Sequence, residues 1–167
     1  MVNSRLITEF VNTRDLKPPA EHLDSPGALV AWLAERDLVA AGTRATRADV
    51  AAAQRLREAL RELAAGDESA LEEVDRAARA AKLSVRFGDG AARMQPEQPG
   101  VRGALGQIVA EVAAALSDGT WTRIKVCEAD DCCWAFHDTS KNRSRHWCSM
   151  QSCGNRAKVR AFRARQG

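Results

Sequence analysis

The sequence predicts a mainly α protein of the α+β class, with a helical N-terminal domain and a small C-terminal domain built around cysteines. Apolar residues recur at helical spacing through most of residues 1–119, which predicts amphipathic helices. The spacing changes to every second residue at 83–87, before a Gly-Asp-Gly turn, which is typical of a small β-hairpin. All five cysteines lie within 127–153. We therefore divide the chain into domains at 1–119 and 120–167.

Residues that favour helix ends mark two of the N-terminal helices. Ser25 followed by Pro26 predicts a helix start, because serine caps the first turn and proline suits the first helical position. Thr46 and Asp49 resemble a capping box and open a long amphipathic helix, which Gly66 closes. The remaining elements follow from apolar spacing: a helix after Asp67, a hairpin that reaches Met94, a helix through 105–116 and a strand over 121–126.

Four of the cysteines form two matched pairs, Cys127 with Cys132 and Cys148 with Cys153, each separated by four residues. Two such pairs joined by a polar loop supply the four thiolates that a tetrahedral structural Zn²⁺ needs. Cysteines clustered in one segment favour a metal site over a disulfide scaffold, which would spread its bridges over the fold. We therefore predict one structural zinc on these four residues.

Other ligand sets remain open. Cys133 could replace Cys132, but the spacing of that pair would then change and its symmetry with the second pair would be lost. His137 and His146 could also bind the metal, although exposed or hydrogen-bonded histidines beside a site are more common. We expect Cys133 to be a spare thiol.

Charge is distributed unequally along the chain. Residues 121–167 hold ten Lys or Arg against four Asp or Glu, a net charge of +6. Residues 1–120 hold fifteen against eighteen, a net charge of −3. An acidic body with a basic end indicates that the basic end meets a polyanion.

Two segments of the basic end carry the predicted DNA contacts. Ser149 can cap a helix that runs from Met150 toward the end of the chain, with Val159 and Phe162 docked on the zinc core. A solvated helix end, where cations favour the helix dipole, is the alternative for this segment. We expect the polyanion to be contacted from the loop by Lys141, Asn142, Arg143 and Arg145, and from the helix by Asn155, Arg156, Lys158, Arg160 and Arg163.

Several classes of protein fit the sequence poorly. No run of about eighteen apolar residues occurs, so we expect no membrane association. The first residues lead into no apolar signal core, and we expect a cytoplasmic protein. His137, Asp138, Asn142 and His146 are residue types of metal-dependent nucleases, but their order and spacing do not form a catalytic set. We therefore expect no enzyme activity.

The C-terminal residues resemble the CGNR zinc-finger family, and the first residues resemble the ABATE domain that usually accompanies it. The resemblance rests on Cys127-x4-Cys132-x-Trp134-x-Phe136-x-Asp138-x-Ser140, on Arg143-x-Arg145-x-Trp147-Cys148-Ser149-Met150-x2-Cys153-Gly154-Asn155-Arg156-x-Lys158, and on Leu6-Ile7-Thr8-Glu9-Phe10-Val11-Asn12-Thr13. Glu9 stands where the ABATE pattern has Asp. The resemblance implies a bacterial, stress-linked transcription regulator with a DNA-binding tail and a mainly helical, ligand-sensing body.

Two hypotheses for function follow. The first is a DNA-binding transcription regulator, in which RNA remains an alternative to DNA. The second is a zinc-containing protein–protein interaction module that does not touch DNA. Asn12 and Thr13 either brace the body, which is the more common use of such residues, or contact a small-molecule effector. Because one small module buries little DNA surface, we also expect a homodimer.

Overall fold

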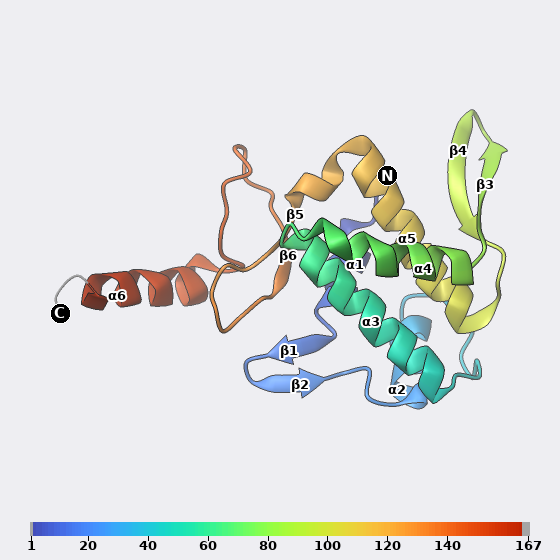
Figure 1. Cartoon of the computed structure of the whole chain (residues 1–167), viewed down its shortest axis with the longest axis horizontal. Helices are drawn as coiled ribbons and strands as arrows, with labels where there is room; N and C mark the ends of the chain where they lie inside the picture. Colours follow the sequence, from blue (N-terminus) through green and yellow to red (C-terminus); the bar gives the residue numbers. More distant parts are fainter. Residues whose placement is uncertain (1, 165–167) are drawn as a thin grey trace.

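A computed structural model describes residues 2–164. The described chain forms a mainly helical body that ends in a cysteine cluster and a projecting helix (Figure 1). The α-helices are α1 (Ser4–Val11), α2 (Pro26–Ala34), α3 (Arg47–Ala64), α4 (Leu71–Ala80), α5 (Gly100–Asp118) and α6 (Asn155–Ala164). Three antiparallel pairs are formed by β1 (Arg14–Leu16) with β2 (Pro19–Glu21), β3 (Leu83–Gly88) with β4 (Ala91–Pro96), and β5 (Ile124–Val126) with β6 (Ala135–His137). The mainly α, α+β fold class is confirmed.

The hydrophobic core lies between α1, α3 and α5, with α2 and α4 packed around them. Phe10 of α1, Leu56 and Leu60 of α3 and Ile108 of α5 are fully buried. Apolar side chains of this size contribute about 1.5–3 kcal/mol each when they leave water. Ile124 and Ala135 of the β5–β6 pair belong to the same core, so the first strands of the C-terminal domain pack on the body.

The helix ends follow the local chemistry that the sequence predicts. The Ser25 hydroxyl accepts a hydrogen bond from the Ala28 N–H, and Thr46 and Asp49 form a reciprocal capping box at the start of α3. Gly119 ends α5 with a φ of 79°, a left-handed conformation that glycine adopts without steric cost. The predicted β3–β4 hairpin is also present, with Val85 opposite Met94.

Four local features differ from the sequence-based expectations. The predicted strand at 121–126 is wrong in its first half, because a 3₁₀ helix (Thr120–Arg123) precedes β5. The expected helix from Met150 begins as a π-helical turn (Met150–Gly154), which Ser149 caps as predicted, and becomes α-helical only at Asn155. Neither α1 nor the β1–β2 pair was expected; both are short, and α1 is capped by the Asn3 side chain.

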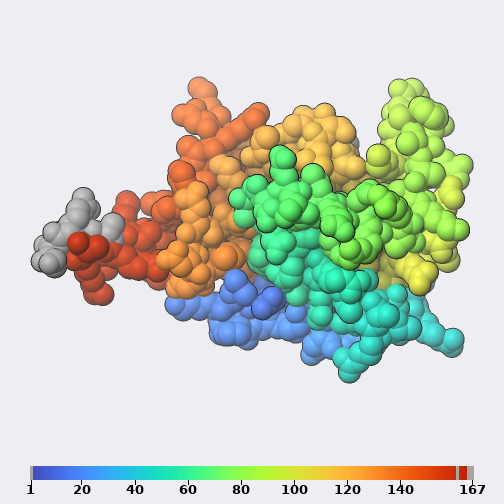
Figure 2. Space-filling view, in the orientation of Figure 1, coloured from blue at the N-terminus to red at the C-terminus, as the bar shows by residue number. Residues whose placement is uncertain are grey.

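Two elements project from opposite ends of the molecule, the β3–β4 hairpin at one end and α6 at the other (Figure 2). The expectation that Val159 and Phe162 dock on the zinc core is wrong: these side chains are 47% and 56% exposed. The reason is the direction of α6, which leads away from the cysteine cluster and the body (Figure 1). Within the described residues, no helix has the length and hydropathy needed to cross a bilayer.

Candidate metal centre and basic surface

The four predicted zinc ligands meet in one cluster. The Sγ atoms of Cys127, Cys132, Cys148 and Cys153 all lie within 4.8 Å of one another. The Cys132–Cys148 and Cys148–Cys153 sulfur separations are both 3.7 Å. Four sulfurs around a tetrahedral Zn²⁺, with Zn–S bonds of about 2.3 Å, lie about 3.8 Å apart. The donor set and its dimensions therefore fit one structural zinc.

Backbone turns hold each cysteine pair in this arrangement. In the first pair, the Cys132 N–H donates to the Ala129 carbonyl at 2.8 Å and the Cys127 N–H donates to the Trp134 carbonyl at 2.9 Å. In the second pair, the Gly154 N–H donates to the Ser149 carbonyl at 3.0 Å. Two tight turns thus aim the thiols at a common point.

The chemistry of the cluster also favours a metal. Burial raises the pKa of the Cys132 thiol to about 11 and raises that of the Cys148 thiol as well. The pKa of Cys153, by contrast, is lowered, because the effect of its burial is outweighed by hydrogen bonds from Cys132 and Ser152. A bound cation would hold all four sulfurs as thiolates. A bound zinc supplies folding free energy to a segment that has little apolar core of its own.

The alternative ligands take other positions. Cys133 has a φ of 50° and lies outside the four-sulfur group. The His146 Nδ1 lies 2.7 Å from a carboxylate oxygen of Glu128, and neither His146 nor His137 belongs to the cluster. The four-cysteine prediction is the one that the geometry supports.

Asp138 organises the loop between the two cysteine pairs. Its side chain is fully buried and accepts hydrogen bonds from the Lys125 ammonium at 2.8 Å and from the backbone N–H groups of Ser140 and Arg145 at 2.9 and 3.0 Å. Burial alone would raise the pKa of Asp138, but these donors outweigh burial and hold it well below its usual range. The ionised carboxylate therefore fixes both ends of the 139–145 loop.

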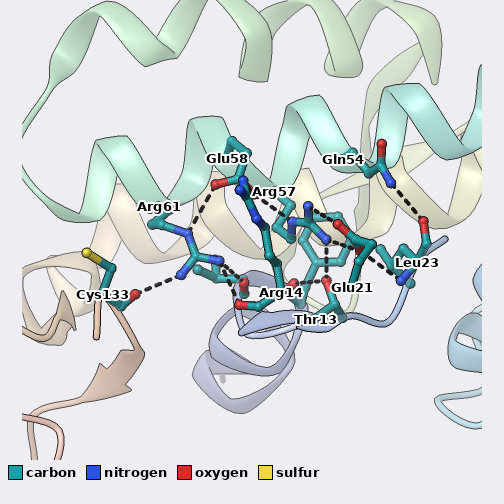
Figure 3. A network of polar contacts seen from close by, with 11 residues as sticks. Thr13, Arg14, Glu21, Leu23, Gln54, Arg57, Glu58, Arg61 and Cys133 are labelled. Carbon is teal, nitrogen blue, oxygen red and sulfur yellow. Dashed lines mark hydrogen bonds and ion pairs between the residues drawn. The ribbon is translucent and has the colours of Figure 1, made fainter. Parts of the chain in front are cut away.

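A buried arginine connects the body to the first cysteine pair (Figure 3). Arg61 of α3 donates to the Cys133 carbonyl at 2.7 Å, to the Val11 carbonyl at 2.7 Å and to the Arg14 carbonyl at 3.2 Å. Its Nε also lies 3.2 Å from the Glu58 carboxylate. One side chain therefore links α1, β1 and the residue next to a zinc ligand.

One helical turn earlier, Arg57 forms the centre of the same network. Its guanidinium is 2% exposed and pairs with both carboxylate oxygens of Glu21 at 2.6 and 2.7 Å. It also contacts Glu58 at 2.9 Å and the Thr13 hydroxyl at 3.3 Å. Burial raises the pKa of the Glu21 carboxyl, but hydrogen bonds from Arg57 and the Leu23 N–H outweigh burial, so the pKa is lowered overall.

Asn12 and Thr13 brace this junction. The Asn12 amide donates to the Ala135 carbonyl and accepts from the Ala135 N–H, both at 2.8 Å. The buried Thr13 hydroxyl donates to the Phe10 carbonyl at 2.7 Å. Neither residue lines the 790 Å³ cavity of the body, which lies among α1, α5 and β4. Bracing accounts for both side chains, and effector binding through them stays a prediction.

The predicted DNA-contacting residues fall into two groups. Arg145 is partly buried and donates to the Cys148 carbonyl at 2.7 Å, so it supports the second cysteine pair. Arg156 lies 3.2 Å from Asp131 and 3.3 Å from the Cys153 sulfur, and Arg160 lies 3.6 Å from Asp130. The exposed members of the predicted set are Lys141, Asn142, Arg143, Asn155, Arg156, Lys158, Arg160 and Arg163.

Sequence reasoning missed the structural roles of Asp138, Arg57 and Arg61. Arg57 and Arg61 follow Leu56 and Leu60 directly in α3, and such arginines normally face solvent. The one available signal was their spacing of four with Glu58 between them, which allows ion pairs along a helix. Asp138 belongs to the Cys127–Ser140 pattern of the zinc finger, but its position in that pattern does not predict that its side chain is buried or that it holds the loop.

Comparison with known families agrees with this geometry. The profile of the CGNR zinc finger matches residues 123–166, which include all four clustered cysteines. The profile of the ABATE family, described as "Putative stress-induced transcription regulator", matches residues 4–119. No curated protein matches the chain. Since the ABATE match covers more than half of the sequence, the chain belongs to the ABATE family and carries a CGNR zinc finger after that domain.

Proposed function

We propose that the protein is a DNA-binding transcription regulator, rather than an enzyme, and that α6 and the 139–145 loop form its DNA-contacting surface. The family description supports regulation of transcription. The observation that carries the proposal is the position of the exposed basic residues. They lie on two segments, α6 and the loop before it, which both belong to the part of the molecule remote from the β3–β4 hairpin, the loop rising from its upper side and α6 extending to the left (Figure 1).

The zinc centre gives this surface its orientation. Cys148 precedes the π-helical turn that leads into α6 and Cys153 lies within that turn, while Arg145 and Asp138 fix the loop. A small module can therefore present cations on a defined surface without a large core. Phosphate contacts of this kind position a protein on the duplex and supply much of its affinity.

Acidic residues of the first cysteine pair lie close to the basic surface. Asp131 pairs with Arg156 and Lys17, and Asp130 pairs with Arg160. Exposed pairs of this kind contribute about 0–1 kcal/mol, so phosphates can displace them at low cost. Lys158 lies between Arg156 and Arg160 on the exposed helix, and Arg163 lies beyond them. About five phosphate contacts in all would give a log–log salt slope of roughly −4 to −5.

The test compares two double variants with equal changes in net charge. Arg160→Glu with Arg163→Glu alters α6, whereas Arg79→Glu with Arg86→Glu alters exposed arginines of the body. We expect the α6 variant to lose DNA binding at 150 mM salt and the body variant to keep most of it. Arg156 stays unchanged because it also contacts the Cys153 sulfur. Equal binding by both variants and the parent would exclude α6 as the contact surface.

A protein-interaction module remains the second candidate, because Val159 and Phe162 are exposed on α6. An apolar pair on an otherwise basic helix fits a partner protein with an acidic, apolar groove. Val159→Gln with Phe162→Gln would then abolish capture of one discrete partner from nuclease-treated extract. The DNA proposal instead expects this variant to keep the DNA affinity and the salt slope of the parent.

A further inference from the structure

An apolar groove lies between the second cysteine pair and α6. It has a volume of about 470 Å³, within the range of small-ligand sites. Its lining consists of Trp147, Met150, Gly154 and Ala157, which we call the apolar floor, and of the polar or charged Ser144, Arg145, His146 and Lys158. Met150 is 55% exposed, so the floor is open to an entering group.

The side chains of the floor are held in place by packing and hydrogen bonds with their neighbours. A Cβ atom on Gly154 would lie 2.6 Å from the Met150 sulfur and 2.8 Å from Cδ1 of Trp147, so only glycine lets both side chains close on this turn. His146 packs its ring edge-to-face on Trp147, with ring centroids 5.4 Å apart. Arg145 donates to the Trp147 carbonyl at 3.5 Å and to the Cys148 carbonyl at 2.7 Å. Trp147 is therefore held from several sides.

The charge around the groove selects the kind of occupant. Among the residues that line it, Arg145 and Lys158 are cationic and none is acidic. The groove also adjoins the basic surface of α6 that the proposed function assigns to phosphate contact. A flat, apolar-faced group attached to a phosphate fits such a place, because aromatic and thioether side chains pack on its face while the cations meet its charge.

We infer that this groove receives a single unstacked nucleobase of the bound DNA, an inference that rests on the DNA binding proposed above. Phosphate contacts by α6 place the duplex, and the base that turns out of the stack packs on Trp147 and Met150. Taking a base out of a paired duplex costs free energy, and this cost is least where the base is already unpaired. The protein should therefore prefer DNA that offers an unpaired base.

The experiment uses three DNAs of equal length: a paired duplex, the same duplex with one bulged thymidine, and the same duplex with a bulged abasic site. The full zinc-loaded chain should bind the thymidine bulge about tenfold more tightly than the abasic bulge, given the usual contribution of base–aromatic stacking. The abasic DNA keeps the extra sugar and phosphate but lacks the base, so the difference between the two bulged DNAs reports the contribution of the base, and the groove variants below assign it to the groove.

Ala157→Leu fills the groove without changing charge, and Ala164→Leu places the same side chain further along α6, outside the groove. We expect Ala157→Leu to bind the two bulged DNAs equally while keeping its affinity for the paired duplex, and Ala164→Leu to behave like the parent. Met150→Ala, which removes part of the floor, should reduce the preference as well. Zinc content and circular dichroism confirm that each variant is folded.

The outcomes separate this inference from the proposed function. If the parent binds all three DNAs with equal, salt-dependent affinity, the base site is excluded and the regulator proposal stands. If the thymidine preference persists in Ala157→Leu and in Met150→Ala, the base binds elsewhere and the inference is overturned. If the parent binds none of the DNAs, the proposed DNA binding is refuted, and the nucleobase site, which depends on it, is refuted with it.

Discussion

Replacement of Arg61 by methionine tests whether the body holds the zinc finger in place. The guanidinium is 10% exposed and donates to three backbone carbonyls, those of Cys133, Val11 and Arg14, besides its contact with Glu58. Hydrogen bonds from a charged donor contribute about 1.5–3 kcal/mol each, and removal of one partner from a buried ionic group costs about 3–5 kcal/mol. Glu58 keeps Arg57 and Arg14 as partners, so we expect a loss near the lower end, about 3–4 kcal/mol.

Urea unfolding of the zinc-loaded protein, followed by tryptophan fluorescence, measures this loss directly. Arg55→Met is the matched control on the same helix, because Arg55 is 53% exposed and pairs only loosely with Glu73 at 3.3 Å; it should cost less than about 1 kcal/mol. Zinc transfer to a chromophoric chelator should also become faster in Arg61→Met. If Arg61→Met unfolds within about 1 kcal/mol of the parent, the carbonyl contacts do not stabilise the junction and the reasoning is refuted.

Three further predictions concern the zinc ligands, the loss of stability at acid pH and the contact of Asn12 with β6. The parent and Cys133→Ser should both bind one zinc per chain by mass spectrometry of the metal content, whereas Cys148→Ser should bind almost none; full zinc in Cys148→Ser would contradict the four-cysteine site. Because the pKa of Glu21 is lowered in the folded state, its stabilisation is complete above the unfolded value of about 4.3 and fades as the pH falls through the folded value. Glu21→Gln should therefore unfold at lower urea than the parent at pH 7, and the gap should narrow as the pH falls below the unfolded value of about 4.3; a constant gap would exclude the ion pair as its source. Asn12→Ala removes two hydrogen bonds to β6 and should cost about 1–3 kcal/mol in the same urea assay; an unchanged urea midpoint would show that water replaces the amide.

Local signals in the sequence were sufficient for the starts of α2 and α3 and for the four clustered cysteines. Ser25 and the Thr46–Asp49 box act within one turn, so their geometry follows from neighbouring residues. The cysteine pairs are equally local, since each pair closes a short turn, and their meeting around one metal follows from the chemistry of thiolates. These features need no knowledge of distant contacts.

The missed features depend on contacts between distant parts of the chain. Arg61 looks like a surface residue until Val11 and Cys133 are brought beside it, which no local pattern reveals. The direction of α6 was missed as well, because it is not encoded in a local pattern. Val159 and Phe162 have the spacing of a docked helix face, yet α6 leads away from the body and leaves both side chains exposed (Figure 1). Periodicity predicts which residues share a face, but it does not give the direction in which that face points.

The Asn12 amide bonds the peptide of Ala135 with both a donor and an acceptor, as a neighbouring strand would, and so closes the free edge of β6. Open strand edges invite pairing with foreign chains. A finger transplanted by gene fusion onto an unrelated protein would carry this edge uncovered, together with the apolar Ile124 that the body now buries. The body and the first strands of the finger thus form one packed structural unit. A test of the proposed DNA contact is therefore better made by exchanging the 139–145 loop and α6 on the existing body than by moving the finger to another protein.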